Sequence, residues 1–122
     1  SFAGRSFAGE IEHLKGMMKE AINHKGFALV DILQPCVSFN KVNTYEWYRQ
    51  RIYRLGGEHD PSDRKAAFAM ALEWGDRIPL GVIYRHDRPT FEERSPVLSG
   101  LPLVKQEQFN RGKLARTLAD FR

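Results

Sequence analysis

The chain has 122 residues, of which 42% are hydrophobic and 28% charged, and its formal net charge at pH 7 is +4. This length and composition exclude wholesale disorder and fit one globular unit with a core of its own. The 19 basic and 15 acidic residues are interspersed along the sequence and leave no clustered basic segment, so no nucleic-acid partner is expected.

Three features bear on where the protein works. The apolar runs are far shorter than the roughly 20 residues that span a bilayer, so neither a membrane segment nor a membrane partner is expected. A single cysteine, Cys36, cannot form an internal disulfide, and no secretory signal is visible, which together predict a reducing, cytoplasmic setting. The opening "SFAGRSFAGE" lacks an initiator methionine, and we expect the chain to be a piece of a longer protein.

The first third of the chain predicts a helix followed by a strand. Residues 10–23 carry apolar side chains at helical spacing and are followed by Gly26, a usual helix terminator. The run "FALVDIL", residues 27–33, is nearly continuous in apolar residues, which predicts a parallel strand covered on both faces. Asp31 interrupts this run and is expected at a strand edge or bonded to backbone amides. A further strand is compatible with residues 1–3.

Residues 34–84 continue the alternation of helices and strands. After a loop at 34–42, we expect a second helix from Asn43 to about Leu55, with Asn43 and Glu46 spaced as a capping box. A third helix is expected from about Pro61 to Trp74, followed by a short buried strand, "PLGVIY", at 79–84. This order predicts an α/β fold with a small parallel sheet flanked by helices.

The sequence changes character after residue 84. Pro89, Pro96, Pro102 and Gly100 predict an extended tail, and helical spacing of apolar residues at 105–121 predicts a terminal helix. The expected organisation is therefore an α/β portion at 1–84 and a tail at 85–122.

Cys36 is the candidate site residue, because it lies in a loop expected at the carboxyl end of a strand, where open α/β sheets place their ligands. From the residues alone three roles remain open: an inert packed thiol, a metal or cluster ligand, and a nucleophile. None of the four histidines has a characteristic spacing to Cys36, and the chain has no further cysteine for a zinc site. No Walker or G-x-G-x-x-G pattern is present either.

Two long segments resemble a known family. They are "GFALVDILQPCVSFNKVNTYEWYRQRIYRL" and "HDPSDRKAAFAMALEWGDRIPLGVIYRHDRPTFEE". Together they are similar to the C-terminal part of the beta subunit of 2-oxoacid:ferredoxin oxidoreductases, over residues 7–93. The most specific pieces are "QPCVSFNKVNTYEW", "HDPSDRKAA" and "ALEWGDRIPLG".

This resemblance implies the C-terminal part of a thiamine-diphosphate-binding fold. It implies an enzyme that oxidatively decarboxylates a 2-oxoacid, 2-oxoglutarate or a broader range, with coenzyme A to an acyl-CoA and reduces ferredoxin. The implied cofactors are thiamine diphosphate, Mg²⁺ and a 4Fe-4S cluster, and the implied partners are the alpha subunit and ferredoxin. Cys36 resembles the cluster ligand that lies far in sequence from the other cysteines, as iron-sulfur proteins allow.

The resemblance also implies what this chain lacks. The Gly-Asp-Gly-type segment that holds magnesium and the diphosphate, and the other cluster cysteines, belong to upstream sequence. No catalytic or cofactor-binding residue is therefore expected here apart from Cys36, and the chain alone is expected to be inactive. The alternative is a stand-alone α/β interaction domain in which Cys36 is structural.

Overall fold

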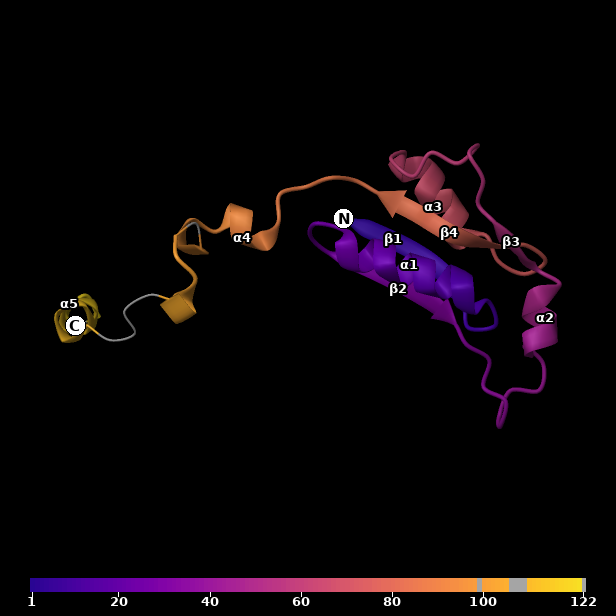
Figure 1. The fold of residues 1–122 in the computed structure, drawn as a ribbon, viewed down its shortest axis with the longest axis horizontal. Coiled ribbons are helices and arrows are strands. Elements are labelled where there is room, and N and C mark those ends of the chain that lie inside the picture. Colours follow the sequence, from indigo (N-terminus) through magenta and orange to yellow (C-terminus); the bar gives the residue numbers. More distant parts are fainter. Residues whose placement is uncertain (99, 106–109, 122) are drawn as a thin grey trace. The chain divides into compact units, whose positions relative to one another are not determined.

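The computed structural model describes residues 1–98, 100–105 and 110–121. The chain divides into two compact units, Ser1–Thr90 and Phe91–Arg122. The first unit is a four-stranded sheet flanked by helices (Figure 1), which confirms the predicted α/β class. Its elements in chain order are β1 (Phe2–Phe7), α1 (Ile11–Asn23), β2 (Ala28–Leu33), α2 (Tyr45–Arg49), β3 (Ile52–Arg54), α3 (Arg64–Leu72) and β4 (Ile78–Arg85).

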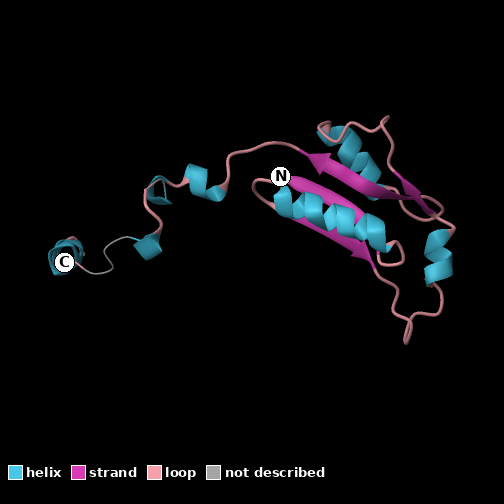
Figure 2. Ribbon diagram, viewed as in Figure 1, coloured by secondary structure: helices cyan, strands magenta, loops and turns pink. Residues whose placement is uncertain are grey.

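The sheet is mixed, with the strand order β2-β1-β4-β3. The pairs β1–β2 and β3–β4 are parallel, whereas the central pair β1–β4 is antiparallel, so the sheet is not the purely parallel one that the sequence predicts. Each parallel pair is joined through a helix, α1 or α3, because parallel neighbours need a crossover connection. The unit therefore consists of two strand-helix-strand motifs that meet along β1 and β4 (Figure 2).

The two crossover helices cover opposite faces of the sheet. Ser6 in β1 turns toward α1, where its Oγ lies 2.9 Å from Nδ1 of His13. Arg5, the preceding residue, turns the other way, and its Nη2 donates to the carbonyl oxygen of Ala71 in α3 at 3.2 Å. Because successive side chains in a strand point to opposite faces, α1 and α3 lie on different sides of the sheet.

A small apolar core lies on the sheet where β1 and β2 end and β4 begins. Its buried members are Phe7, Leu33, Ile78 and Leu80. Helix α2 covers this core with aromatic side chains, because the ring of Phe7 lies 5.5 Å from those of both Tyr45 and Tyr48. Tyr45 and Tyr48, which follow the predicted loop at 34–42, thus contact the core and hold the C-terminal end of that loop in place.

The predicted second helix is too long. Helix α2 ends at Arg49, and Ile52–Arg54 form strand β3 beside β4. The spacing of Tyr48 and Ile52 fits a helix, but Ile and Tyr also favour strands, and pairing with β4 decides between the two. The helix is capped by Thr44, whose Oγ1 accepts from Trp47 N at 3.3 Å, rather than by the predicted Asn43 and Glu46 pair.

The third helix is present but shorter than predicted. Helix α3 begins at Arg64, after the cap residue Asp63, whose carboxylate accepts from the backbone N of Lys65 at 2.8 Å. The earlier Asp60 instead closes a local turn by accepting from Ser62 N at 2.8 Å. The predicted strands at 1–3 and 79–84 are both present and both longer, as β1 and β4.

Strand β2 is where the structure differs most from expectation. The strand itself is confirmed, but it ends the sheet, and Leu29 and Ile32 on it are 54% and 38% exposed. The expected cover on both faces is therefore absent from the part of the chain that the structure describes. Asp31 accepts from Nε of Arg5 at 2.8 Å, so its carboxylate at this strand edge is paired with a guanidinium instead of backbone amides.

The second unit contains short helices. Helix α4 spans Phe91–Arg94, two 3-10 turns follow, and helix α5 spans Arg111–Ala119, within the stretch where a terminal helix is predicted. Asn110 caps α5, since its Oδ1 accepts from Lys113 N at 3.1 Å. Phe109, which the prediction includes in this helix, lies outside the described residues.

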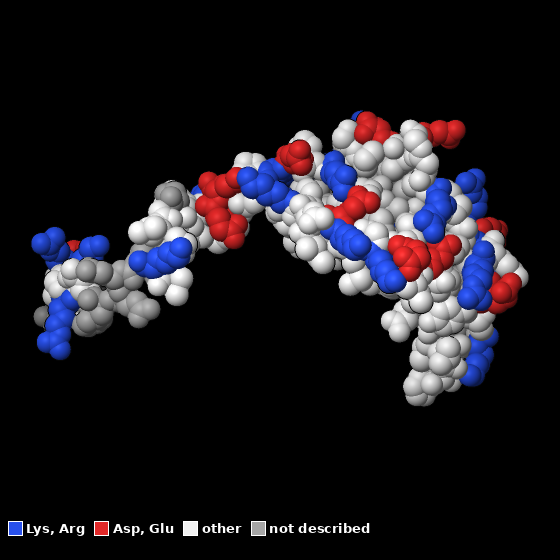
Figure 3. Space-filling view, in the orientation of Figure 1, with Lys and Arg blue, Asp and Glu red and all other residues white. Residues whose placement is uncertain are grey.

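Charged groups of both signs are mixed on the face of the first unit that Figure 3 shows, as the interspersed sequence predicts. Within the described ranges, none of the helices has the length and apolar character needed to cross a membrane.

One glycine supports the junction of β3 and β4. Gly81 has φ +136°, and a Cβ built on it would lie 3.3 Å from Cβ of Leu55. We expect Gly81→Ala to lower the free energy of unfolding by about 1–3 kcal/mol, because the backbone must leave this conformation or be strained. Urea unfolding measures the change. Gly57→Ala, where nothing lies within 4 Å of the added Cβ, is the matched control, and equal losses in both variants would contradict this interpretation.

Candidate functional site

Cys36 lies in the loop that leaves the carboxyl end of β2, where the sequence places it. Leu33 and Pro35, just before it, are buried and anchor the start of the loop. The thiol of Cys36 itself is free and exposed. Cys36 is therefore not packed within the described part of the chain, and the roles of metal or cluster ligand and of nucleophile stay open.

Hydrogen bonds fix the shape of the loop after Cys36. The backbone N of Asn40 donates to the carbonyl oxygen of Cys36 at 3.0 Å, which closes a single turn. The Oδ1 of Asn40 accepts from the backbone N of Val42 at 3.0 Å and of Asn43 at 2.9 Å. Lys41 adds a bond from Nζ to the carbonyl oxygen of Val37 at 2.6 Å. Residues 36–43 are thus held by local bonds, with the side chain of Asn40 at their centre.

The turn lowers the pKa of the Cys36 thiol. Hydrogen bonds from the backbone of Phe39, then Ser38, and to a smaller extent Asn40 lower the pKa of the thiol from its ordinary value. Such donors stabilise the negative charge of a thiolate, which is the form that binds metals. The loop therefore favours Cys36 as an anionic, accessible ligand.

The loop of Cys36 carries three exposed apolar side chains. Val37, Phe39 and Val42 on the same loop are 68%, 92% and 73% exposed. No group of three or more His, Cys, Asp or Glu residues able to hold a metal ion occurs among the residues that the structure describes. Cys36 thus offers one thiolate on a loop with exposed apolar side chains, and any metal centre here needs further ligands from elsewhere.

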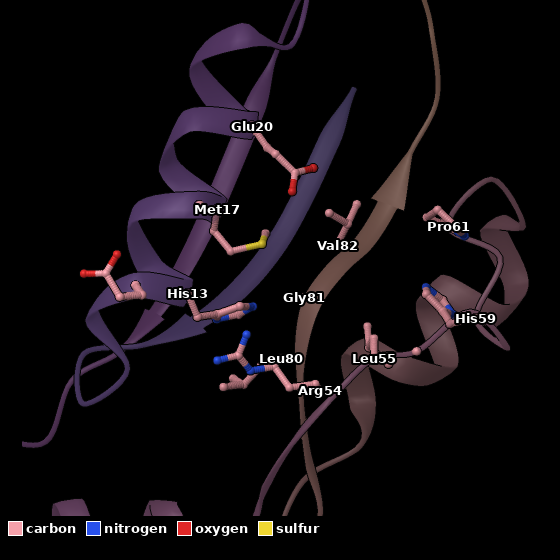
Figure 4. A pocket seen from close by; sticks show the side chains of 13 residues that line it. His13, Met17, Glu20, Arg54, Leu55, His59, Pro61, Leu80, Gly81 and Val82 are labelled. Atoms are coloured by element: carbon pink, nitrogen blue, oxygen red, sulfur yellow. The ribbon is translucent and has the colours of Figure 1, made fainter.

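A groove lies beside β4, apart from the loop of Cys36. This groove has a volume of about 730 Å³ and lies between α1, the segment after β3 and the middle of β4 (Figure 4). Its polar lining includes Glu20 and His13 from α1 and Arg54 and His59 from the segment around the end of β3. None of its lining residues belongs to the loop of Cys36.

The two histidines in the groove are already engaged in the fold. His13 contacts Ser6, and Nε2 of His59 lies 2.8 Å from the carbonyl oxygen of Ile83. Glu20 pairs with Arg85, with 2.6 Å between Oε2 and Nη2. No pattern in the sequence predicts this groove, because its residues are far apart in the chain and meet only through the strand order. These polar groups are bonded to other parts of the fold, so the groove is a hydrogen-bonded surface. Its lining residues show no arrangement of nucleophile and base.

The side chain of Asn40 is expected to set the reactivity of Cys36. In Asn40→Ala the bonds to Val42 and Asn43 are lost and the turn loosens, so the pKa of the thiol should rise toward its ordinary value. The rate of alkylation by iodoacetamide near neutral pH should fall several-fold, because only the thiolate reacts. Asn23→Ala, on α1, is the control. An unchanged alkylation profile in Asn40→Ala would show that the turn does not depend on this side chain.

The stability of the first unit is expected to decline in mild acid through His13. Burial, then the charge of Arg54, lowers the pKa of His13 below 6.5, while nearby Glu10 and Glu20 act in the opposite direction. The unfolded chain therefore takes up the proton first, and the stability that neutral His13 supplies is complete above pH 6.5 and lost as the pH falls below it. Urea unfolding at two pH values, one on each side of 6.5, should show this loss, and His13→Gln should reduce it. His86→Gln is the control; equal pH dependence in both variants would contradict the assignment.

Comparison with known proteins identifies the family. Residues 36–100 match the family described as the C terminal of the pyruvate ferredoxin oxidoreductase beta subunit. The chain is 42% identical to a 2-oxoacid:ferredoxin oxidoreductase subunit beta from Sulfolobus sp, over 93% of this chain and 43% of that protein. It is also 42% identical to 2-oxoacid:ferredoxin oxidoreductase 1, subunit beta, from Aeropyrum pernix, over 77% of this chain and 33% of that protein.

A solved structure agrees with these relatives. The fold is similar to that of a 2-oxoglutarate:ferredoxin oxidoreductase from Magnetococcus marinus, which contains bound 2-oxoglutarate, coenzyme A and succinyl-CoA, with a TM-score of 0.78 and 28% identity. The similarity covers 95% of this chain and 40% of that one. The chain spans less than half the length of these relatives. By sequence and by fold, it belongs to the family of 2-oxoacid:ferredoxin oxidoreductase beta subunits and corresponds to their C-terminal region.

Proposed function

We propose that this chain works as the C-terminal part of a 2-oxoacid:ferredoxin oxidoreductase beta subunit and that Cys36 supplies one thiolate ligand of a 4Fe-4S cluster. The observation that carries the proposal is the loop of Cys36. It presents an exposed thiol whose pKa is lowered by backbone hydrogen bonds, in a turn held by its own side chains.

The residues present fit such a cluster, because they can supply one of its thiolate ligands. Iron-sulfur clusters are held by cysteine thiolates, and hydrogen bonds to the sulfurs and the exclusion of water tune their potentials. The backbone of Phe39 and Ser38 lowers the pKa of the Cys36 thiol through hydrogen bonds, and so favours the thiolate that binds iron. The other thiolates would come from the part of the subunit that precedes this region.

The activity proposed for the whole enzyme is the oxidation of a 2-oxoacid with coenzyme A. In balance, one 2-oxoacid anion and one coenzyme A give one acyl-CoA, one CO₂ and one proton, and two electrons pass to ferredoxin. When bound, thiamine diphosphate with Mg²⁺ would stabilise the carbanion, and the cluster would carry the electrons. The contribution of this chain is to hold and orient the thiolate of Cys36, in a complex with the alpha subunit.

The substrate proposed is 2-oxoglutarate or a broader set of 2-oxoacids. The solved relative acts on 2-oxoglutarate according to its name, and the sequence relatives are named for 2-oxoacids in general. We expect the chain to be inactive alone, because the described residues offer the cluster a single thiolate. The alternative is an interaction domain with a structural cysteine, and the match of the chain to a family of oxidoreductase subunits favours the enzyme over it.

The proposal is tested by replacing Cys36 in a complete beta subunit that carries this chain, expressed anaerobically together with the alpha subunit. The Cys36→Ala variant should lose iron and the broad visible absorption of the cluster, and ferredoxin reduction should fall by at least about 10-fold. Ser38→Ala is the matched control in the same loop, because it changes a side chain but keeps the backbone N–H that faces the sulfur.

The measurements are iron per subunit, the visible spectrum and the rate of ferredoxin reduction with a 2-oxoacid and coenzyme A. A normal cluster and normal ferredoxin reduction in Cys36→Ala would show that Cys36 is not a ligand. A normal cluster with no turnover on any 2-oxoacid in the unsubstituted enzyme would contradict the proposed activity instead.

A further inference from the structure

Helix α5 in the second unit is short and exposed on all sides. It spans Arg111–Ala119, and every residue from 110 to 121 is exposed. A helix of nine residues is marginal by itself in water, because few hydrogen bonds follow its costly first turn. Such helices gain most of their stability by packing one face against something else. The side chains of α5 therefore indicate what packs against it.

One side of α5 carries an apolar stripe of Leu114, Leu118 and Phe121, which are 46%, 57% and 85% exposed. Phe121 follows the end of the helix, but Asp120 before it keeps helical dihedral angles, so Phe121 continues the stripe. The spacing of i, i+4 and i+7 places the three side chains within about 60° of one another around the helix axis. This is the anchor spacing by which a helix inserts into an apolar groove of another protein.

Basic side chains border this stripe. At 100° per residue, Arg111 lies about 20° from Leu118 on one flank, and Lys113 lies about 80° from Phe121 on the other. Both are exposed. The apolar stripe of α5 therefore has a basic rim, which is complementary to a groove with carboxylates at its margin.

The basic rim is unfavourable for the helix itself. Arg111 and Lys113 lie in its first turn, which contains no acidic residue, and the helix dipole disfavours cations there. Helix α3 also begins with basic residues, but its cap is the carboxylate of Asp63, which offsets them. Helix α5 has the neutral cap Asn110 instead. A local rule broken without a gain in the fold is expected at functional positions.

Three kinds of partner could take up an amphipathic helix with a basic rim: a lipid surface, another subunit, or an acidic protein that binds reversibly. Helices that lie on lipid have a large apolar face, whereas the stripe of α5 has only three side chains. Permanent subunit interfaces are large and mostly apolar. Electron-transfer complexes have small interfaces, and charge complementarity sets their association rates. The short, charged α5 fits this last kind of partner.

We propose that α5 is a docking helix for the acidic electron-carrier protein that accepts the electrons of the reaction. Its apolar stripe enters an apolar patch of the carrier, and Arg111 and Lys113 face carboxylates around that patch. This inference rests on the proposed function, in which ferredoxin is the acceptor, as the names of the relatives state for those proteins. Complementary charge speeds the encounter, and binding to α5 raises the effective concentration of the carrier at the enzyme.

The test uses the complete beta subunit that carries this chain, together with the alpha subunit, and a ferredoxin of negative net charge. In the Arg111→Glu, Lys113→Glu variant, the KM for ferredoxin should rise by at least about 10-fold at low ionic strength, while kcat stays unchanged. The difference should shrink as salt is added, because salt screens the charges. Reduction of methyl viologen, a small acceptor that needs no docking helix, should not change.

The same variant separates docking from the stability of α5. Glutamates in the first turn favour a helix, so loss of helical structure would not explain a higher KM. The matched control is Arg64→Glu, Lys65→Glu, which makes the same change of charge in the first turn of α3 and should leave the KM for ferredoxin unchanged.

A second variant tests the apolar stripe. Leu114→Ser and Leu118→Ser, combined, should also raise the KM for ferredoxin, and this rise should persist at high salt because it does not depend on charge. Cluster content and methyl viologen reduction should again be normal.

Three results would overturn the inference. The first is an unchanged KM for ferredoxin in both α5 variants with normal methyl viologen reduction, which would leave the proposed function intact. The second is loss of the alpha subunit from either variant during purification, which would identify α5 as a subunit contact. The third is binding of the enzyme to phosphatidylglycerol vesicles that either variant abolishes, which would identify a lipid surface. An unsubstituted enzyme that reduces neither acceptor would contradict the proposed function, and this inference with it.

Discussion

The pairing of β1 with both β2 and β4 is the interaction on which the rest of the first unit depends. One strand-helix-strand motif contributes β1 and β2, the other contributes β3 and β4, and only the antiparallel contact of β1 with β4 joins them into a sheet. Arg5 reinforces this junction from β1, since it bonds Asp31 on β2 and the carbonyl oxygen of Ala71 on α3. Its side chain is largely buried, and its Nη1 lacks a hydrogen-bond partner among the described residues, so removing the carboxylate of Asp31 would leave still more of the guanidinium without compensation.

The pairing of β1 with β2 and β4 also positions Cys36, the candidate cluster ligand. Phe7 at the end of β1 and Leu33 at the end of β2 enter one core, and the aromatic rings of α2 close over it. The loop of Cys36 is therefore fixed at both ends, by β2 on one side and by α2 on the other. Between these anchors, local bonds through Asn40 are sufficient to orient the thiol. When the other ligands of a metal site come from another part of a protein, such pre-organisation raises the affinity of the site, because less conformational entropy is lost on binding.

An incomplete surface explains several features together. The exposed side chains of Leu29 and Ile32 lie on β2, and those of Val37, Phe39 and Val42 lie on the loop that follows it. Their burial by the rest of a subunit would add hydrophobic stabilisation at the same place where a cluster is proposed. Folding of this region and assembly of the metal site would then be coupled, as is usual for metal sites whose ligands come from separate segments.

The sequence by itself determined the α/β class, the helix at 10–23, the strand at 27–33 and the loop of Cys36, because each depends on local periodicity and on glycine and proline as terminators. It also determined the family, through the segments on both sides of Cys36. It could not separate helix from strand at Ile52–Arg54, where a spacing of four fits a helix and only pairing with β4 decides. The mixed direction of the sheet, the edge position of β2, the ion pair of Asp31 with Arg5 and the exposure of Cys36 were decided by the tertiary structure alone. Each of these depends on which distant segments meet, and a local pattern of residues carries no information about that.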